Sequence, residues 1–357
     1  MKIASIVGAR PQFIKCAPVS RELKREHEEI LVHTGQHYDH GMSAIFFEEL
    51  AIPRPDYNLG IGSGTHGHQT GAMLGAIEDV IREEEPDVVL VYGDTNSTLA
   101  GALAAAKLHV PVAHVEAGLR SFDRRMPEEV NRVLTDHCSD LLFCPTATAV
   151  ANLAAEGIRD GVHLVGDVMV DAMHYNRAIA EERSRILEDV GVRSGEYLAI
   201  TVHRPSNTDD RESMAAIVGA LGEAGVPAVF PVHPRTRKYL EEYGLLAEMP
   251  ENVRVVEPLG YIDMIRLMAH AKKILTDSGG IQKEAYMLGV PCITLRENTE
   301  WVETVEAGWN VLVGAGREGI VDAIRSFSPG SRQKDIFGDG NASHRIREIL
   351  TGHQGLR

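Results

Sequence analysis

Short apolar runs alternate with longer amphipathic stretches along the first half of the chain. Runs of strand length, rich in β-branched residues, are KIASIVG, EILVHTG, DVVLVYGD, VPVAHVEAG and LLFCPT. Between them, SRELKREH, GAMLGAIEDVIREEE and TNSTLAGALAAAKLH have the spacing of helices. A strand–helix series of this kind predicts an open, parallel α/β sheet with helices on both faces.

A second series of the same kind follows. Its strand-like runs are EYLAITVH, PAVFPVH, NVRVVEPL, KKILTD and PCITLR, with helical stretches such as RESMAAIVGALGEAG and GIQKEAYMLG between them. The 357 residues also favour two domains at ~150 residues each. We predict an α/β fold of two doubly wound, Rossmann-like domains facing a cleft: residues 1–168 and 169–335, with a C-terminal helix in 336–357 packing back toward the first domain.

Composition and charge exclude several classes of partner. The net charge of −15 argues against nucleic acid or an anionic membrane surface, so an anionic ligand must meet a local basic cluster. No run approaches the ~20 apolar residues of a membrane-spanning helix, and the N-terminal segment is not a signal peptide. The cysteines are scattered without a CxxC pair, which predicts a cytoplasmic protein with neither a disulfide framework nor a zinc site.

Two adjacent glycines follow the strand-like run KKILTD. Ser278, Gly279 and Gly280 then lead into a helix, so bare backbone N–H groups at a positive helix terminus can hold a phosphate. The alternative is a tight turn in which Ser278 caps the helix. Glu284 lies one turn further on, where a carboxylate can accept both hydroxyls of a ribose. A diphosphate and a ribose together indicate a nucleotide.

Cations also follow predicted strands. Arg10 and Lys15 lie just beyond the first strand, and PVHPRTRK adds His233 and Arg235 after a strand of the second series. Exposed surface charges are the alternative interpretation, but Pro11 restricts the backbone directly after Arg10. These residues are candidates for binding phosphates.

Carboxylates gather at the strand ends of the first series. Asp94 ends one strand, where it either acts in the site or caps the next helix, and Glu116 ends the following strand. Burial at a strand end would raise the pKa of Glu116, as general acid–base catalysis requires. Glu128 and Glu129 stand in MPEEVNR, and His203 ends a strand of the second series unless it is a structural histidine. Together these groups suggest proton transfer on a bound nucleotide.

Metal and nicotinamide chemistry are not expected. The remaining histidines lack regular ligand spacing on one element. The segment GSGTHG (62–67) matches GxGxxG, but no convincing buried strand precedes it and no acidic residue ends a second strand about 20 residues further on. We therefore expect no cofactor.

Six segments, in order, resemble the non-hydrolysing UDP-N-acetylglucosamine 2-epimerase family over nearly the whole chain: GARPQFIK, HTGQHYD, GDTNSTLAGALAA, HVEAGLRS, MPEEVNR and TDSGGIQKEA. The resemblance implies the two-domain fold of GT-B glycosyltransferases and a homodimer that needs no metal or nicotinamide. It also implies interconversion of UDP-GlcNAc and UDP-ManNAc, by elimination of UDP to 2-acetamidoglucal and its re-addition.

The resemblance further implies a role for each candidate residue. Ser278, Gly279 and Gly280 would hold the diphosphate with help from Arg10, Glu284 would hold the ribose, and His233 would lie near the nucleotide. The groups around the sugar would be Lys15, Asp94, Glu116, Glu128 and His203. Which carboxylate serves which face of C2 stays open.

Some segments depart from the family pattern. HRREN is HRPSN here, so Ser206 replaces a glutamate; Trp301 replaces an arginine, and Met264 an aromatic residue near the uracil. YDHGMSAIFFEEL replaces the helix that binds an activating second UDP-GlcNAc, which puts that site in doubt. TEWVE and HYDHGMS look more like the subgroup acting on UDP-2,3-diacetamido-2,3-dideoxyglucuronate. Rival functions are a GT-B glycosyltransferase, a hydrolysing epimerase and a non-catalytic nucleotide-sugar sensor.

Overall fold

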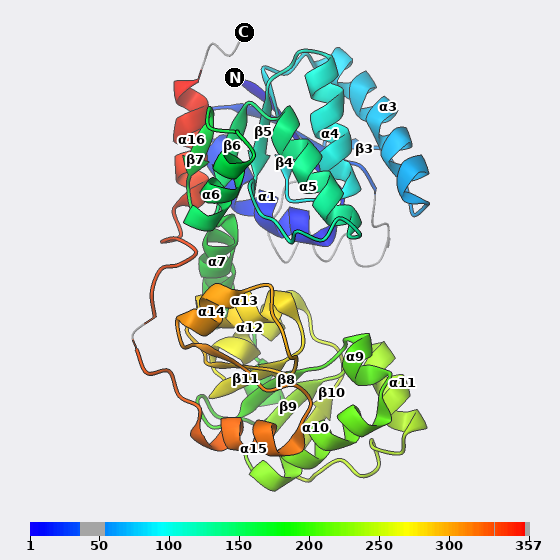
Figure 1. The fold of residues 1–357 in the computed structure, drawn as a ribbon, viewed down its shortest axis with the longest axis vertical. Helices are drawn as coiled ribbons and strands as arrows, with labels where there is room; N and C mark the ends of the chain where they lie inside the picture. The colour runs from blue at the N-terminus through cyan, green and yellow to red at the C-terminus, as the bar shows by residue number, and fades with distance from the viewer. Residues whose placement is uncertain (36–53, 332, 354–357) are drawn as a thin grey trace. The chain divides into compact units, whose positions relative to one another are not determined.

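The computed structural model describes residues 1–35, 54–331 and 333–353, and the chain divides into two units. The first unit is Met1–Tyr175 with Ile336–Arg357, and the second is Asn176–Asp335. The division lies inside helix α7 (Val168–Arg183), so the boundary expected between residues 168 and 169 falls at the start of this helix. The C-terminal helix α16 (Ala342–Gly352) groups with the first unit and packs along α1 (Arg10–Leu23) (Figure 1).

The first unit is built on a parallel sheet of seven strands. In sheet order these are β3 (Tyr57–Asn58), β2 (Glu28–His33), β1 (Lys2–Val7), β4 (Val88–Tyr92), β5 (Val112–Val115), β6 (Leu141–Cys144) and β7 (Val162–Leu164). Its other helices are α3 (His66–Glu84), α4 (Asn96–Lys107), α5 (Pro127–Cys138) and α6 (Ala147–Ala155), with α3, α4 and α5 side by side (Figure 1). The strand order reverses direction between β1 and β4. The carboxyl ends of these two strands are therefore the switch point, where open α/β sheets bind ligands.

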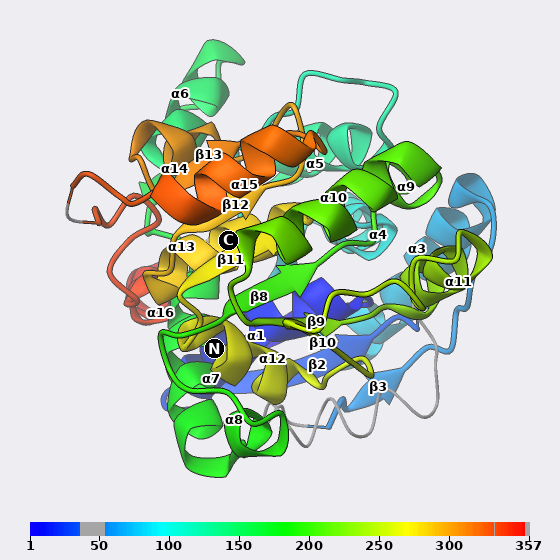
Figure 2. The same cartoon turned by 90° about the horizontal axis from the view of Figure 1, so that it is seen from below.

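The second unit repeats the plan with six parallel strands. In sheet order these are β10 (Val253–Val256), β9 (Ala228–Pro231), β8 (Leu198–Thr201), β11 (Lys273–Thr276), β12 (Cys292–Thr294) and β13 (Asn310–Leu312). Its helices are α8 (Ile186–Asp189), α9 (Pro205–Thr208), α10 (Arg211–Ala224), α11 (Pro234–Glu242), α12 (Tyr261–Ala269), α13 (Gly279–Leu288), α14 (Val302–Glu306) and α15 (Arg317–Ser326). Helices α10 and α15 pack against each other (Figure 2), and the switch point lies between β8 and β11.

The predicted α/β fold is confirmed, and every strand predicted from an apolar run is present. The pattern missed β3, β7 and β13, which are short strands at sheet edges, and it placed the first helix too late. Helix α1 begins at Arg10. Pro11 fits there because the N–H groups of a helix's first turn have no partner within the helix, so the N–H that proline lacks is not missed. Pro18 lies within the helix, where proline normally ends one, so the pattern had suggested a start at Ser20.

Burial explains why the strands read as continuous apolar runs. All five residues of β4 are buried, since helices cover both faces of the sheet. Each fully buried aliphatic side chain of this kind contributes about 1.5–3 kcal/mol. At the end of β1, a Cβ on Gly8 would lie 2.1 Å from the hydroxyl oxygens of Ser97 and Thr34, so only glycine permits this approach. None of the described helices combines the length and apolar character needed to span a bilayer.

Candidate functional site

Lys15 and Glu116 form a buried ion pair at the switch point of the first unit. Lys15 extends from α1 to the carboxylate of Glu116, and their side chains are only 13% and 11% exposed. Burial lowers the pKa of Lys15, but the charges of Glu116 and Asp94 raise it on balance, so the ammonium is retained. A Cβ on Gly93 would lie 3.2 Å from both the Lys15 ammonium and a Glu116 oxygen. The loop after β4 therefore meets this pair.

The backbone of Glu116 is in the left-handed region, with φ of 73°. Such a conformation is uncommon for a residue other than glycine, and strain of this kind concentrates at functional sites. The Lys15 ammonium favours the ionised form of Glu116, which is the form that a general base needs. The pair thus combines a strained carboxylate with a fixed cation.

Asp94, directly after β4, is paired with Arg132 on α5. Arg132 also binds Glu129, with 2.9 Å between Nη1 and Oε2. One guanidinium therefore bridges two predicted acidic groups and holds α5 against the loop after β4. The sequence contained this arginine in MPEEVNR, but nothing in the pattern indicated its partners.

The two adjacent glutamates of α5 have different surroundings. Glu129 is buried, and its carboxylate accepts hydrogen bonds from the backbone N–H groups of Ser121 and Phe122, each at 2.9 Å. Burial would raise the pKa of Glu129, but these hydrogen bonds and the charge of Arg132 lower it on balance. Glu128, the residue predicted for the site, is exposed on the same helical turn.

Gln12, which the sequence analysis did not select, joins the loops that follow β1 and β4. Its side-chain oxygen accepts from the N–H groups of Gly8 and Ala9 at 2.8 and 3.0 Å. Its amide nitrogen donates to the carbonyl of Tyr92 and the hydroxyl of Thr98 at 2.9 and 3.0 Å. Because all four hydrogen bonds of this buried amide are made, the two loops are held in register. Arg10 opens α1, but its side chain lies outside the described part of the structure.

In the second unit, a buried carboxylate organises the loop after β8. Asp277, at the end of β11, is fully buried and accepts from the N–H groups of His203 and Arg204 at 3.1 and 3.0 Å. It also accepts from the Asn207 side chain at 3.0 Å. Asp277 thereby fixes the backbone of the predicted His203, although the sequence analysis had not selected it.

The two predicted histidines of this unit lie near each other, with ring centroids 6.4 Å apart. Burial lowers the pKa of His203; Arg204 and His233 act in the same direction, and Asp277 opposes them. The ring is therefore neutral at pH 7. His233 caps α11, and its Nδ1 accepts from the N–H of Arg235 at 3.2 Å. The free ring position of His233 is thus Nε2.

The glycine pair forms the first turn of α13, as predicted. Ser278 stands at the N-cap but makes no side-chain cap hydrogen bond. Gly280 is exposed, and the nearest atom to a Cβ built there is the Ser278 hydroxyl, at 3.9 Å. Glu284 lies one turn further along the same helix and is half-buried. An open helix N-terminus of this kind attracts anions.

Charged side chains of this unit gather near the same helix terminus. Glu300 contacts Gly279, with 3.0 Å between its Oε2 and a Cβ built there, and binds Arg296 at 3.0 Å. Trp301 packs against Lys283, with 4.4 Å between the ammonium and the ring centroid. These contacts put the Glu300 carboxylate, with its partner Arg296, against the start of α13, and the Lys283 ammonium lies on the same helix.

One expectation cannot be placed. The segment YDHGMSAIFFEEL, expected to lack the activating UDP-GlcNAc site, lies outside the described residues. Within residues 1–35, 54–331 and 333–353, no three His, Cys, Asp or Glu side chains are grouped so that they could hold a metal ion.

Two Rossmann-like units, one with carboxylates and the other with a helix N-terminus at its switch point, define an α/β enzyme of the GT-B type. The chain belongs to the UDP-N-acetylglucosamine 2-epimerase family, whose model matches residues 21–351. It is therefore an epimerase, an isomerase acting on carbohydrates. The resemblance seen in the sequence motifs is confirmed.

Individual relatives agree along the whole chain. A UDP-N-acetylglucosamine 2-epimerase homolog of Methanococcus maripaludis is 57% identical, covering 98% of this chain and 99% of its own. The UDP-2,3-diacetamido-2,3-dideoxy-D-glucuronate 2-epimerase of Pseudomonas aeruginosa is 52% identical, with the same coverage. The UDP-GlcNAc 2-epimerase of Methanocaldococcus jannaschii has a solved structure with a TM-score of 0.90 at 46% identity, covering 99% of this chain and 100% of that one. A second structure of that enzyme, in complex with UDP-GlcNAc and UDP, gives a TM-score of 0.82.

Proposed function

We propose that this protein is a non-hydrolysing UDP-GlcNAc 2-epimerase, which interconverts UDP-GlcNAc and UDP-ManNAc. The observation that carries the proposal is the buried Lys15–Glu116 ion pair at the switch point of the first unit. In a family of carbohydrate epimerases, a fixed carboxylate at such an edge is suited to moving a proton. The complex of the Methanocaldococcus relative with UDP-GlcNAc and UDP supports the choice of substrate.

Nucleotide binding is assigned to the second unit. The N–H groups of Ser278, Gly279 and Gly280 hold the diphosphate, and Glu284 holds the ribose hydroxyls. The uncapped start of α13 and the exposure of Gly280 support this assignment. Two further residues, Arg10 for the diphosphate and His233 near the nucleotide, remain part of the proposal.

The chemistry follows from the acidity of the C2 hydrogen, which is low because C2 is not next to a carbonyl. The C1–O bond to UDP breaks with its electron pair leaving on UDP, and a base takes the C2 proton. A C1–C2 double bond forms, giving 2-acetamidoglucal. A proton then adds to the opposite face of C2 and UDP re-adds at C1, so the reaction is a balanced isomerisation that needs no oxidant or cofactor.

The groups assigned to the proton transfers are Asp94, Glu116, Glu128 and His203. Lys15 keeps Glu116 ionised, as the retained charge of its ammonium supports. The neutral state of His203 at pH 7 permits it to accept or donate a hydrogen bond at its exposed edge. Arg10 and the start of α13 stabilise the departing UDP.

A second substrate deserves testing because Trp301 replaces the arginine expected from the family and packs on Lys283. UDP-2,3-diacetamido-2,3-dideoxyglucuronate carries an extra amide and a carboxylate, which a changed pocket could accept. Incubating the protein with each UDP-sugar and following the H2 signal by proton NMR separates the two. We expect UDP-ManNAc from UDP-GlcNAc; turnover of the uronate alone would assign the protein to the other substrate. Sugar transfer to an added acceptor without epimer would indicate a glycosyltransferase, and irreversible release of UDP a hydrolysing epimerase.

A cytoplasmic homodimer completes the proposal. All four cysteines are free, as expected in a reducing compartment. An apolar face on and before α5 is exposed, formed by Phe122 (78% exposed), Met126 (40%), Val130 (40%) and Leu134 (47%). Exposed apolar side chains gathered on one face commonly mark subunit contacts. Light scattering should give a dimer, and Leu134→Asp should shift it toward a monomer; a monomeric wild-type protein would contradict this part.

A further inference from the structure

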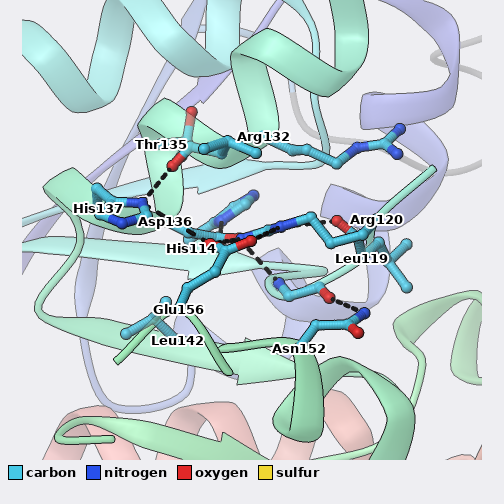
Figure 3. Close-up of polar contacts among 12 residues, drawn as sticks. His114, Leu119, Arg120, Arg132, Thr135, Asp136, His137, Leu142, Asn152 and Glu156 are labelled. Atoms are coloured by element: carbon cyan, nitrogen blue, oxygen red, sulfur yellow. Dashed lines mark hydrogen bonds and ion pairs between the residues drawn. The ribbon is translucent and has the colours of Figure 1, made fainter. Parts of the chain in front are cut away.

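A buried ion network lies beside the two strand-end loops that carry Asp94 and Glu116. It consists of His114 on β5, Asp136 on α5, Arg120 after β5, and Glu156 at the end of α6 (Figure 3). The Asp136 carboxylate accepts from His114 Nδ1 and Arg120 Nη1, each at 2.7 Å. Arg120 in turn donates to both oxygens of Glu156 at 2.7 Å.

His114 is held at both ring nitrogens within this network. Its Nε2 lies 2.7 Å from the carbonyl oxygen of Gly93, which can only accept, so Nε2 carries a proton. Burial alone would raise the pKa of Asp136, but the contacts with His114 and Arg120 lower it on balance. Three side chains of the ion network are fully or almost fully buried: His114, Asp136 and Arg120.

The ion network fixes the backbone on both sides of Glu116 and directly before Asp94. Asp136 accepts from the N–H of Gly118, two residues after Glu116, at 3.1 Å. His114, two residues before Glu116, donates to the carbonyl of Gly93. The Asp136 carboxylate thus binds the loop after β5 directly and is linked to the loop after β4 through His114.

These loops need such support because the backbone of Glu116 is strained, with φ of 73° in the left-handed region. Gly93 and Gly118, at 65° and 79°, adopt the same region without strain because glycine has no Cβ. A Cβ on Gly118 would lie 2.4 Å from the carbonyl oxygen of Ala149, so the loop after β5 is also packed tightly against α6. Buried, fully paired ions hold one arrangement of such loops, because breaking any pair would leave a charge unpaired in the interior.

We propose that Asp136, with His114 and Arg120, is a positioning residue for the epimerisation: it sets the places of Glu116 and Asp94 without touching substrate. This rests on the proposed function, in which those two carboxylates handle the C2 proton. A displacement of about 1 Å at a reacting group commonly costs about 100-fold in rate. The ion network lies in the first unit, whereas the α13 residues assigned to the nucleotide lie in the second unit. Its loss therefore acts on kcat and leaves nucleotide binding unchanged.

The test is Asp136→Asn, which keeps the shape but places an amide group against N–H donors. We expect kcat to fall about 30- to 100-fold, with KM for UDP-GlcNAc and Kd for UDP within about threefold of wild type. The matched control is Asp171→Asn. Asp171 is another carboxylate of the first unit; it accepts from the N–H groups of Ala342 and Ser343 at 3.2 and 2.8 Å, away from the strand-end loops. Its loss should lower the melting temperature without changing kcat.

Three outcomes decide the proposal. A wild-type kcat in Asp136→Asn, with only the melting temperature reduced, would overturn it. If this variant does not fold, His114→Gln and His114→Asn replace it: glutamine can keep the bond to Gly93 and asparagine cannot, so Asn should be about tenfold slower, and equal rates would overturn the proposal. Glu116→Gln is run in parallel. If Glu116→Gln turns over normally, the proposed function has failed. If Glu116→Gln is inactive and Asp136→Asn has a normal kcat, only the positioning role of Asp136 has failed.

Discussion

The two units share one sheet topology but place opposite chemistry at their switch points. In the first unit, Glu116 and Asp94 are acidic groups matched by the cations Lys15 and Arg132. In the second unit, the buried Asp277 accepts hydrogen bonds from backbone and amide N–H groups. The N-terminus of α13, which follows Asp277, has no side-chain cap. The comparison teaches that one scaffold serves proton transfer or anion binding, depending on whether its carboxylates meet cations or backbone N–H groups.

The largest expected effect comes from removing the cation of the first unit. Lys15→Met leaves Glu116 buried without its partner, so the carboxylate is driven toward its protonated form and no longer acts as a base. We expect kcat to fall by about 1000-fold, with the affinity for UDP unchanged. Steady-state kinetics and calorimetric titration with UDP measure the two quantities.

Lys107→Met serves as the matched control, because Lys107 is an exposed lysine of the same unit. It should leave both quantities at the wild-type values. Near-wild-type kcat in Lys15→Met would show that the ion pair is structural, and the contrast between the units would lose its catalytic meaning.

The second prediction concerns the anion site of the other unit. Gly280→Ala adds a methyl group into space that is open in the structure, so folding is unaffected or improves by up to about 1 kcal/mol. If the diphosphate lies against this turn, the methyl group should weaken UDP binding by at least about tenfold. Gly75→Ala in α3, where a Cβ also meets nothing, is the control and should bind UDP normally. Normal binding by Gly280→Ala would place the diphosphate elsewhere.

A smaller effect is expected from the carboxylate that holds the His203 loop. Asp277→Asn removes one charge-assisted acceptor, and we expect kcat/KM to fall about tenfold through a looser His203. The sign of the pKa change is a sharper readout. Asp277 raises the pKa of His203 against the larger effect of burial, so its removal should lower that pKa further below 6.5. If an NMR titration instead gave a higher pKa for His203 in Asp277→Asn, it would contradict the environment described for His203.

The smallest effect concerns a carboxylate that is not at a strand end. Glu29, near the start of β2, is buried and bound by the hydroxyls of Ser5 and Ser20, and burial raises its pKa above 4.5 despite these hydrogen bonds. Because the folded pKa is the higher one, its stabilising contribution is present below about pH 4.5 and is lost as pH rises through the folded pKa.

Glu29→Gln should therefore stabilise the fold by about 1 kcal/mol at pH 7, with the gain shrinking toward pH 4.5. Thermal unfolding at a series of pH values measures this. A destabilised variant at pH 7 would show that Glu29 is held ionised, like the carboxylates at the switch point.

The strand ends and the helix start at which both candidate sites are proposed could be predicted from the sequence, because they depend on local information. Strand ends and the Ser278–Gly280 turn are visible as short patterns, and parallel strands bring their ends to one edge. Pairings between distant segments were not visible. Arg132 meets Asp94 across 38 positions, and Asp277 meets His203 across 74.

The sequence also did not show which side of each helix is buried. Glu128 and Glu129 are adjacent, and only the rotation of α5 about its axis decides that Glu129 is buried. The ion network around Asp136 was missed for both reasons, since it joins β5, α5 and α6 through side chains with no common motif.

The most direct test of the central claim is proton NMR with UDP-GlcNAc in D2O, comparing the wild-type protein with Glu116→Gln. The account predicts deuterium at C2 and growing UDP-ManNAc signals with the wild type. With Glu116→Gln it predicts neither signal, although the variant still binds UDP. Deuterium entering C2 at the wild-type rate in Glu116→Gln would contradict the assignment of proton transfer to the first unit's carboxylate. UDP-ManNAc formed without deuterium would contradict the elimination route itself.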